Sequence, residues 1–504
     1  MNIVNRLRFV AAAYEDKPAV VTVEKELTYG ELYDLVDRYA AALADLGIGA
    51  DDRFALLMGN STRMLSLILA GWQIGATAAP VNVRLGDDTI EFLVDDAEAG
   101  TVVVDESRDD LLAIAEGIEG ADTITSGKDG DVESRLPTSA DPGVTPRLDD
   151  ELALLLHTAG TTGRPKWVKH TNHTLSGSVG VAVGRKVGPE DRNLHYFPLY
   201  HSGGIDMTLS RLSCGGTVVI GSGWDPGEAL ELVERERVMG MDLVPQMGYE
   251  FVHHDDVDDY DLSSLEYIFV GADTVSEELA AEFRDLGAQP VQAYGLTETM
   301  AVIAVTEFGD TDCPLDSTGR VIGDLARGKV VDPETGEELP AGEIGEILLT
   351  GDKLTPGYHN RPEREAEVFE DGWIHTEDLG MVDEDGYLHI TGRLDNMMIV
   401  GGENVYPTDV EETLKTHPAI SQAVVVSIPD ERKSEVPVAN VVLNDGETLS
   451  EDELKQWFIE TDAAFKHPRH VRFVAQLPTT PIGKIDRMSI TEAVNSEVGS
   501  GVGD

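Results

Sequence analysis

Short apolar segments alternate with segments of helical periodicity in the first part of the chain, and this alternation limits the possible folds most strongly. Apolar residues recur at helical spacing across Leu32–Leu46, and Gly47 then ends the predicted helix. Strand candidates follow at Phe54–Met58, Val102–Val104 and Leu152–Leu156. Strands that alternate with helices of ten or more residues imply right-handed parallel crossovers. The pattern therefore predicts a layered α/β fold.

The C-terminal part of the chain has a different pattern. Ala423–Ile428 and Val438–Leu443 are strand candidates, and Glu451–Thr461 is a helix candidate. At 504 residues the chain is too long for one ordinary core. We therefore predict a large N-terminal domain of α/β subdomains, residues 1–394, and a small α+β domain, residues 395–504.

The chain is strongly acidic, with 93 Asp and Glu against 38 Lys and Arg and a net charge of −55. Repulsion at this density should weaken the compact state in dilute buffer, whereas about 1 M salt shortens the Debye length to about 3 Å. The simplest interpretation is a protein from a high-salt cell. An acidic tail is the rival interpretation, but the acid is spread along the chain. Thermal melting should therefore rise with KCl, and a flat response would contradict this interpretation.

Composition also limits the compartment and the partners. No Lys/Arg cluster stands out to neutralise phosphates, so nucleic acid is not an expected partner. No membrane-spanning apolar run or secretory signal is visible. Cys214 and Cys313 suggest neither a disulfide framework nor a cysteine-built metal site. We expect a cytoplasmic protein with reduced thiols, and a homodimer is left open.

Two stretches are especially acidic. Residues 105–150 are rich in Asp, Glu, Ser and Gly and are expected to form a weakly structured surface connection. The run His253–Asp259 has residue types that bind metals, but its density of acids matches the bias of the whole chain. A solvated surface is the favoured interpretation of this run.

The strongest local motif is Thr158–Lys166, which follows the apolar run Leu152–Leu156 and reads TAGTTGRPK. A strand that ends in glycine and hydroxyl residues presents backbone N–H groups and hydroxyls to phosphate oxygens. The motif is not a Walker P-loop, which requires G-x-x-x-x-G-K-[ST] before a helix. Taken alone, such a turn is more often structural.

Four further segments, taken together with this motif, make the motif specific for one family of proteins. In chain order they are Tyr294–Glu298 (YGLTE), Gly372–Gly380 (GWIHTEDLG), Gly392–Pro407 (GRLDN followed by GGENVYP) and Pro478–Arg487 (PTTPIGKIDR). Together with the glycine-rich turn, they resemble the adenylate-forming superfamily of acyl-CoA synthetases, firefly-type luciferases and peptide-synthetase adenylation domains. The resemblance covers nearly the whole chain and implies an acyl-CoA synthetase that uses ATP, Mg²⁺ and coenzyme A.

The resemblance implies a role for each matched residue at the triphosphate. The residues that match the mobile phosphate loop, for the β- and γ-phosphates, are Thr158, Thr161, Thr162, Gly163 and Lys166. Thr297 matches the residue that bonds the α-phosphate, and Glu298 matches the Mg²⁺ ligand. A carboxylate is the hard oxygen ligand that Mg²⁺ prefers.

The nucleoside is assigned in the same way. Tyr294, followed by Gly295, resembles the ring that lies against adenine, with the turn Gly271-Ala272-Asp273 on its other side. Asp378 matches the acid that accepts hydrogen bonds from both ribose hydroxyls, and Arg393 supports the same region.

The C-terminal domain supplies the remaining matches. Lys484 resembles the catalytic lysine that bridges the carboxylate and the α-phosphate, a role that suits an ammonium on a flexible stem. Asp395 occupies the hinge position about which the family rotates this domain between the half-reactions. Gly401 and Gly402 then line the tunnel for the pantetheine arm, where glycine permits close backbone approach.

The acyl site is less specific. His201, in the segment FPLYHSGG, matches a residue near the carboxylate and the CoA channel, and a packed histidine is an equal alternative. Val244–Met247 and Met300–Ile303 should face the acyl chain. They are apolar and contain no cation for a second carboxylate, which favours fatty or aromatic acids.

Several positions depart from the family pattern. Ala159 stands where serine is commoner, and Trp167 replaces a glycine and should stiffen or cover the phosphate loop. Glu377 replaces a glycine beside Asp378. None of these changes removes a catalytic charge, although they leave the rate and the loop motion open.

We therefore predict an AMP-forming acyl-CoA synthetase that acts on a medium- or long-chain fatty acid. Alternatives are an aryl or other carboxylate–CoA ligase, an enzyme that stops at the adenylate or transfers it to a carrier protein, and a catalytically silent nucleotide-binding protein.

Overall fold

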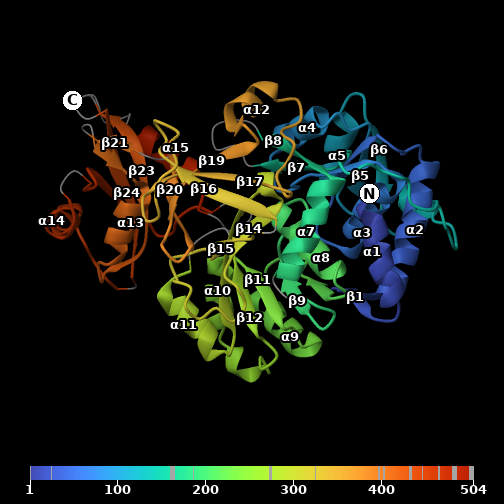
Figure 1. Ribbon diagram of the computed structural model, residues 1–504, viewed down its shortest axis with the longest axis horizontal. Coiled ribbons are helices and arrows are strands. Elements are labelled where there is room, and N and C mark those ends of the chain that lie inside the picture. Colours follow the sequence, from blue (N-terminus) through green and yellow to red (C-terminus); the bar gives the residue numbers. More distant parts are fainter. Residues whose placement is uncertain are drawn as a thin grey trace. The chain divides into compact units, whose positions relative to one another are not determined.

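The structure is a computed structural model (Figure 1). It describes residues 2–23, 25–158, 165–184, 187–271, 275–323, 325–394, 398–400, 403–430, 434–444, 446–463, 466–479 and 485–498. The chain divides into two compact units. The first contains residues 1–328 and 349–374, and the second contains residues 329–348 and 375–504. The domain boundary at residues 394 and 395 stays a prediction, because residue 395 lies outside the described residues.

One sheet of the first unit has the order β6-β5-β3-β4-β7-β8. Its strands are β3 (Arg53–Leu57), β4 (Thr77–Pro80), β5 (Thr101–Asp105), β6 (Asp122–Ser126), β7 (Leu152–Thr158) and β8 (Lys166–Thr171). All neighbours are parallel except β7 and β8, which form an antiparallel pair. The strands predicted at residues 54–58, 102–104 and 152–156 are therefore confirmed.

A second sheet of this unit has the order β15-β14-β13-β12-β11-β9-β10-β1-β2. The strands are β1 (Pro18–Val21), β2 (Glu26–Thr28), β9 (Arg192–His195), β10 (Thr217–Ile220), β11 (Gly240–Leu243), β12 (Tyr267–Val270), β13 (Gln289–Leu296), β14 (Ala301–Val305) and β15 (Arg320–Val321). Pairing is parallel from β13 through β1 and antiparallel at both edges. The parallel crossovers expected from the sequence are thus present.

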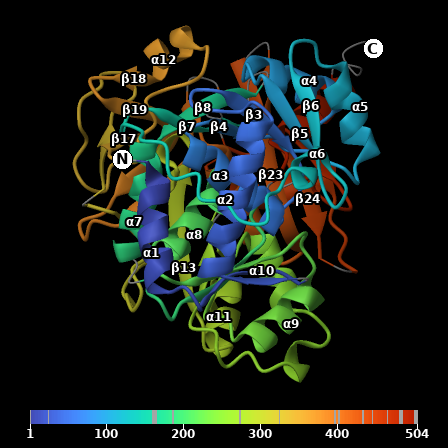
Figure 2. The ribbon, with the colours of Figure 1, turned by 90° about the vertical axis from the view of Figure 1, so that its right-hand side faces the viewer.

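Helices of the first unit connect and cover these strands. They are α1 (Ile3–Ala13), α2 (Tyr29–Asp45), α3 (Thr62–Ile74), α4 (Asp87–Asp96), α5 (Asp109–Gly117), α6 (Asp131–Ser134), α7 (Asn172–Gly184), α8 (Ser202–Leu212), α9 (Pro226–Glu236), α10 (Pro245–Val252), α11 (Glu277–Asp285) and α12 (Pro362–Val368), with 3₁₀ turns η1 (Val257–Asp259) and η2 (Thr297–Thr299). Helix α2 packs against α3 (Figure 2) and ends before Gly47, whose φ is +91°, as predicted. In the part of the chain that is described, no helix is long and apolar enough to cross a membrane.

The expectation for residues 105–150 is wrong for much of that range. Helix α5, strand β6 and helix α6 occupy it, and β6 extends the sheet by pairing in parallel with β5. Helix α5 buries Leu111 and Ala115, and helix α6 buries Val132. These few apolar residues were missed in the sequence because most of the exposed positions around them are acidic.

The second unit contains strands and helices around its own core. Its elements in chain order are β20 (Leu388–Arg393), β21 (Met398–Val400), β22 (Glu403–Val405), α13 (Pro407–Lys415), β23 (Ile420–Asp430), β24 (Ser434–Leu443), α14 (Glu451–Thr461), β25 (His470–Phe473) and α15 (Arg487–Val498). Three strands have residues in both units: β16 (Ala326–Val331), β17 (Gly345–Gly351) and β19 (Trp373–Val382). Strand β18 (Phe369–Glu370) belongs to the first unit. One sheet has the order β22-β21-β24-β23, with β25 beside β24. The predicted strands and helix near residues 423–461 are confirmed, and the mixed α/β class is confirmed for both units.

His195 makes the stability of the first unit depend on pH. It lies on β9 with no exposed surface, and burial lowers the pKa of its imidazole to about 3. The folded pKa lies below the unfolded value of about 6.5, so the unfolded chain binds the proton first as pH falls. The histidine's contribution is present above pH 6.5 and is lost progressively between pH 6.5 and pH 3.

We expect His195 alone to lower the free energy of unfolding by about 2 kcal/mol between pH 7 and pH 5. Urea unfolding of the wild type and His195→Gln at both pH values measures this, because the difference between their pH responses removes the contribution of all other groups. Equal pH responses of the two proteins would show that the folded state accepts the proton.

Candidate active site

The glycine-rich turn is fixed at both ends by an antiparallel pair. Thr158 at the end of β7 lies opposite Lys166 at the start of β8. The Thr158 hydroxyl oxygen is buried and has no hydrogen-bond partner among the described residues, so it fits a site that bonds a ligand. Thr161, Thr162 and Gly163 lie outside the described residues, as does Ala159. Their predicted phosphate contacts stay predictions.

The YGLTE motif forms the corner between β13 and η2. Tyr294 and Gly295 lie among the last residues of β13, which ends at Leu296, and Thr297 and Glu298 begin η2. A Cβ on Gly295 would lie 1.6 Å from the carbonyl oxygen of Ala301, so a side chain cannot be accommodated there. The glycine therefore lets β13 approach β14 closely and places the next residues at the strand end.

A strained turn follows and was not found from the sequence. Met300 and Ala301 have φ of +47° and +60°, a region that non-glycine residues rarely adopt. The Thr299 hydroxyl secures the turn by accepting a hydrogen bond from the Leu296 N–H and lying 3.0 Å from the Ala301 carbonyl oxygen. Such strain persists only where the surroundings hold it. Here it reverses the chain directly beside Glu298.

Glu298 is held by a residue from a distant part of the chain. The Tyr358 hydroxyl donates to Oε1 of Glu298 at 2.7 Å, and the Lys166 ammonium lies 4.5 Å from the centroid of the Tyr358 ring. The structure thus brings together the predicted phosphate lysine and the predicted metal ligand through one tyrosine. A partly exposed carboxylate oriented in this way fits Mg²⁺, which takes few carboxylates and completes its shell with phosphates and water.

Trp167 packs into the core of the first unit. Its side chain is fully buried, and its indole N–H donates to the Leu93 carbonyl oxygen at 2.9 Å. His157 lies against it in an edge-to-face arrangement and stacks on Tyr200. The tryptophan therefore anchors β8 to α4. Its predicted effect on the phosphate loop stays a prediction, because residues 159–164 lie outside the described residues.

His201 is the N-cap of helix α8. Its Nδ1 accepts a hydrogen bond from the Gly203 N–H at 3.1 Å, which satisfies one donor at the helix start. The histidine therefore stabilises the start of helix α8. Its role near the carboxylate and the CoA channel stays a prediction.

A buried ion pair lies beside one of the predicted acyl segments. The Lys353 ammonium donates to the Val302 carbonyl oxygen at 2.8 Å and lies 3.2 and 3.3 Å from the two carboxylate oxygens of Asp206 on α8. Neither charged side chain is exposed. Sequence reasoning missed this cation because Lys353 is remote from Met300–Ile303 along the chain. Asp206 balances its charge, so it is not an open site for a second carboxylate.

In the second unit, Asp378 and Arg393 face each other across β19 and β20. An Nη of Arg393 donates to Oδ1 of Asp378 at 2.9 Å, and its other Nη lies 3.2 Å from Glu377. Asp378 is nearly buried. The structure thus brings the predicted ribose acid and the predicted arginine together, and their roles at the ribose stay predictions. Glu377, the departure from glycine, adds a second carboxylate to the same guanidinium.

Glu377 also has φ of +61°, where a side chain is disfavoured. We expect Glu377→Gly to be more stable than Glu377→Ala by about 1 kcal/mol, after allowance for the greater freedom of unfolded glycine. Both variants lack the carboxylate, so urea unfolding of the two isolates the backbone effect. An alanine variant as stable as the glycine variant would show that the positive φ relaxes at no cost.

Several predicted residues lie outside the described residues: Lys484, Asp395, Gly401, Gly402, Ala272 and Asp273. Gly271 is described, and its N–H donates to the Leu243 carbonyl oxygen at 3.1 Å just after β12. The roles of this whole group in catalysis, hinge motion, pantetheine binding and adenine binding stay predictions.

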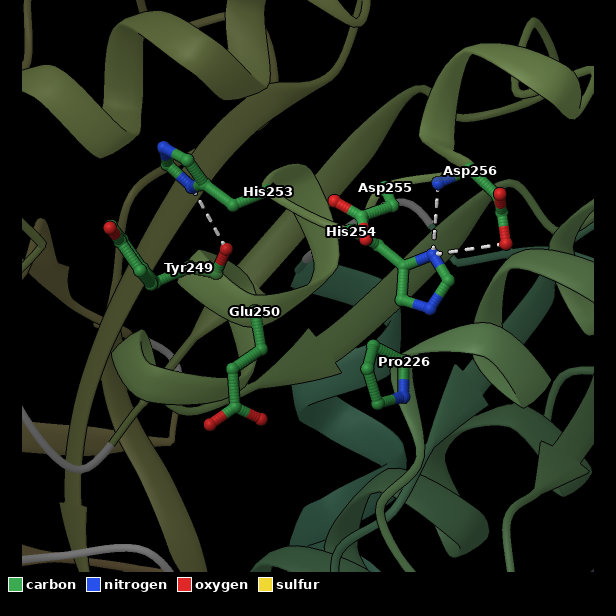
Figure 3. A pocket seen from close by; sticks show the side chains of 7 residues that line it. All are labelled: Pro226, Tyr249, Glu250, His253, His254, Asp255 and Asp256. Carbon is green, nitrogen blue, oxygen red and sulfur yellow. Dashed lines mark hydrogen bonds and ion pairs between the residues drawn. The ribbon is translucent and has the colours of Figure 1, made fainter.

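The acidic run at residues 253–259 borders a shallow surface pocket of about 560 Å³ (Figure 3). His253 turns toward Tyr249, whereas His254 turns toward Asp256. Across the described parts of the chain, no group of three or more His, Cys, Asp or Glu side chains is arranged to hold a metal ion. The pocket thus gives no support to the metal interpretation.

Comparison with known proteins agrees with this geometry. The AMP-binding enzyme family matches residues 7–359, and the AMP-binding enzyme C-terminal domain matches residues 409–484. The chain is 36% identical to a feruloyl-CoA synthase from Amycolatopsis sp over 462 residues, covering 91% of this chain and 92% of that protein. It is 32% identical to the medium/long-chain-fatty-acid–CoA ligase FadD8 of Mycobacterium tuberculosis, covering 97% and 90%.

Solved structures share the fold. The ATP-bound chimera RpMatB-BxBclM B3 superposes with a TM-score of 0.91 at 29% identity, covering 98% of this chain and 99% of that one. The two family matches occur in the same order as the motifs TAGTTGRPK and PTTPIGKIDR. The chain therefore belongs to the AMP-binding enzyme family, in its branch of AMP-forming acid–CoA ligases.

Proposed function

We propose that this enzyme joins an apolar monocarboxylic acid to coenzyme A, using ATP and Mg²⁺ and passing through an acyl-adenylate. The observation that carries the proposal is the contact of Tyr358 with both Lys166 and Glu298. A phosphate-binding cation and a metal-binding acid, assigned from motifs far apart in the sequence, contact the ring face and the hydroxyl of one tyrosine. This arrangement is suited to the triphosphate of a metal-bound nucleotide.

In the first half-reaction, a carboxylate oxygen of the acid attacks the α-phosphorus of ATP and the bond to pyrophosphate breaks. Two anions must meet, so the site has to offset negative charge. Lys166 and the hydroxyls of Thr158 and Thr297 would bind phosphate oxygens, and Asp378, held by Arg393, would accept the ribose hydroxyls. Mg²⁺ held at Glu298 would neutralise charge on the phosphates. Lys484 would bridge the carboxylate and the α-phosphate.

In the second half-reaction, the thiolate of coenzyme A attacks the acyl carbon and AMP leaves with the electron pair of the acyl–oxygen bond. The proposal assigns the pantetheine path to Gly401 and Gly402, with rotation about Asp395 between the two halves. Adenylation as the first half makes this displacement feasible, because AMP leaves more readily than an oxide ion.

The nature of the acid rests on the segment Met300–Ile303. Met300, Val302 and Ile303 are buried and apolar, and the Lys353 charge beside Val302 is balanced by Asp206. Among the described residues, a second carboxylate on the acid would find no free cation beside this segment and would carry a desolvation cost. A medium- or long-chain fatty acid, as predicted from the sequence, fits these features. An aryl acid is the second candidate, favoured by the 36% identity to a feruloyl-CoA synthase.

A matched set of acids tests the proposal: octanoate and palmitate for the fatty class, ferulate for the aryl class, and octanedioate as the dicarboxylate counterpart of octanoate. We expect thioester formation with at least one monocarboxylate. For octanedioate we expect kcat/KM lower than for octanoate by about 10²-fold or more, as for a buried polar group left unpaired. Equal turnover of octanoate and octanedioate would contradict an apolar acyl site.

The same assay separates the other proposals. Pyrophosphate release without thioester would indicate an enzyme that stops at the adenylate or uses a carrier protein. Silence across a broad panel would indicate a nucleotide-binding protein without catalysis. The proposal further places the enzyme in the cytoplasm, and sedimentation would test the homodimer that the sequence left open.

A further inference from the structure

Residues 355–359 connect strand β8, which begins at Lys166, with the 3₁₀ turn η2, which contains Glu298. Along β8, the Lys169 N–H donates to the Gly357 carbonyl oxygen at 3.0 Å and the His359 N–H to the Trp167 carbonyl oxygen at 2.8 Å. At the other end, the Thr355 N–H donates to the Glu298 carbonyl oxygen at 2.8 Å. One short segment is therefore bonded to both elements that carry the predicted triphosphate ligands.

The backbone at Tyr358 is fixed by a second set of contacts. The Tyr358 N–H donates to Oε1 of Glu365 at 2.7 Å, and the same oxygen lies 2.8 Å from the Lys169 ammonium. Gly357 has φ of +133°, and a Cβ there would lie 2.1 Å from the Glu365 carboxylate. The tyrosine is thus held from its own main chain as well as from its neighbours.

The Tyr358 side chain has little freedom left. Only 3% of it is exposed, and it packs with Val168, Val368 and Phe369. A rigid ring presents its hydroxyl to Glu298 and its face to the Lys166 ammonium. The hydroxyl contact is a hydrogen bond to a charged group, and the ring contact is a cation–π interaction.

We infer that Tyr358 is a positioning residue for the metal-bound triphosphate, orienting the Glu298 carboxylate with its hydroxyl and restraining the Lys166 ammonium with its ring. The inference rests on the proposed function. A direct ion pair between Lys166 and Glu298 would leave less of each charge for the ligands. A neutral side chain that contacts the cation and the acid separately avoids this loss, and groups already in place need no reorganisation when the nucleotide binds.

Two substitutions separate the contributions of the hydroxyl and the ring. Tyr358→Phe keeps the ring beside Lys166 and removes the hydrogen bond to Glu298, whereas Tyr358→Leu removes both. Tyr33→Phe is the matched control, because it deletes a buried hydroxyl that has no hydrogen-bond partner among the described residues. Glu298→Gln and the double variant Tyr358→Phe/Glu298→Gln complete a double-mutant cycle.

The readout is ATP binding by calorimetry with and without Mg²⁺, in KCl and in the absence of acid and coenzyme A. We expect Tyr358→Phe to weaken binding of the Mg²⁺–ATP complex about tenfold, the scale of losing one hydrogen bond to a charged group, and to leave metal-free ATP binding unchanged. Tyr358→Leu should weaken both, since it also releases Lys166. In the Glu298→Gln background, Tyr358→Phe should have no further effect.

Binding of Mg²⁺–ATP by Tyr358→Phe as tight as by Tyr33→Phe would overturn the inference, and so would losses that simply add in the double variant. If the wild type and the variants bind ATP as expected but the wild type makes no acyl-CoA, the proposed function alone would be overturned. Acyl-CoA formation with unaltered Tyr358→Phe binding would overturn the positioning role alone. Absence of ATP binding by the wild type would overturn both.

Discussion

Replacement of Lys484 by alanine is expected to slow formation of the acyl-adenylate by about 10²–10³-fold, the scale of losing one preorganised charge contact in a transition state. The physical reason is that negative charge accumulates where the carboxylate meets the α-phosphate, and an ammonium that bridges both offsets it. The family resemblance assigns this lysine to the first half-reaction only. Pyrophosphate release from ATP and acid is the measurement.

The second half-reaction provides the internal control for this variant. Lys484→Ala should form thioester from preformed acyl-adenylate and coenzyme A at the wild-type rate. Lys455→Ala is a matched control, because Lys455 is a surface lysine of the same unit that pairs with Glu451 on α14. Equal damage to both half-reactions, or equal damage by Lys455→Ala, would contradict the role assigned to Lys484.

Replacement of Asp206 by asparagine is expected to lower the stability of the first unit by about 3–5 kcal/mol, because the Lys353 ammonium would be left buried without its counter-ion. Asparagine keeps the size of the side chain, so the loss reports charge and not a cavity. The urea midpoint, followed by circular dichroism in KCl, measures it.

The double variant Asp206→Leu/Lys353→Met tests whether the uncompensated Lys353 ammonium causes the loss of stability. Removal of both charges should recover most of the stability, since an apolar pair of similar volume often replaces a buried ion pair without loss. A double variant as unstable as Asp206→Asn would show that packing at α8, and not the uncompensated ammonium, determines the effect.

The parts of the site that lie within continuous motifs could be predicted from the sequence. Thr158 and Lys166 lie at the two ends of one turn, and Thr297 and Glu298 are neighbours, so local spacing was sufficient to group them. Tyr358 could not be found in this way. It lies sixty residues from Glu298, and the contact depends on how the segment at 355–359 pairs with β8.

Buried charges were hidden for a related reason. Lys353 and Asp206 are 147 residues apart, and the residues around each of them form no motif that would predict an ion pair. The acidic composition added to the difficulty, because most carboxylates of the chain need no partner. A carboxylate on helix α8 therefore gave no signal that it balances a lysine beside Val302.

The fold was predictable where apolar periodicity is strong. Helix α2 has a continuous apolar face and ends two residues before Gly47, at Asp45, whereas α5 buries only Leu111 and Ala115. The same contrast explains why β5 was found and its neighbour β6, which has a single buried residue, Ser126, was missed. Pairing with β5 supplies the stability that the local sequence of β6 lacks.

The central claim, that the chain is an AMP-forming acid–CoA ligase, is tested most directly by separating nucleotides and thioesters after incubation with Mg²⁺–ATP, acid and coenzyme A. KCl at about 2–3 M screens the acidic surface. We predict equal amounts of AMP and acyl-CoA, with no acyl-CoA when ATP is left out. Formation of ADP in place of AMP, or no thioester from any acid of the panel, would contradict the account.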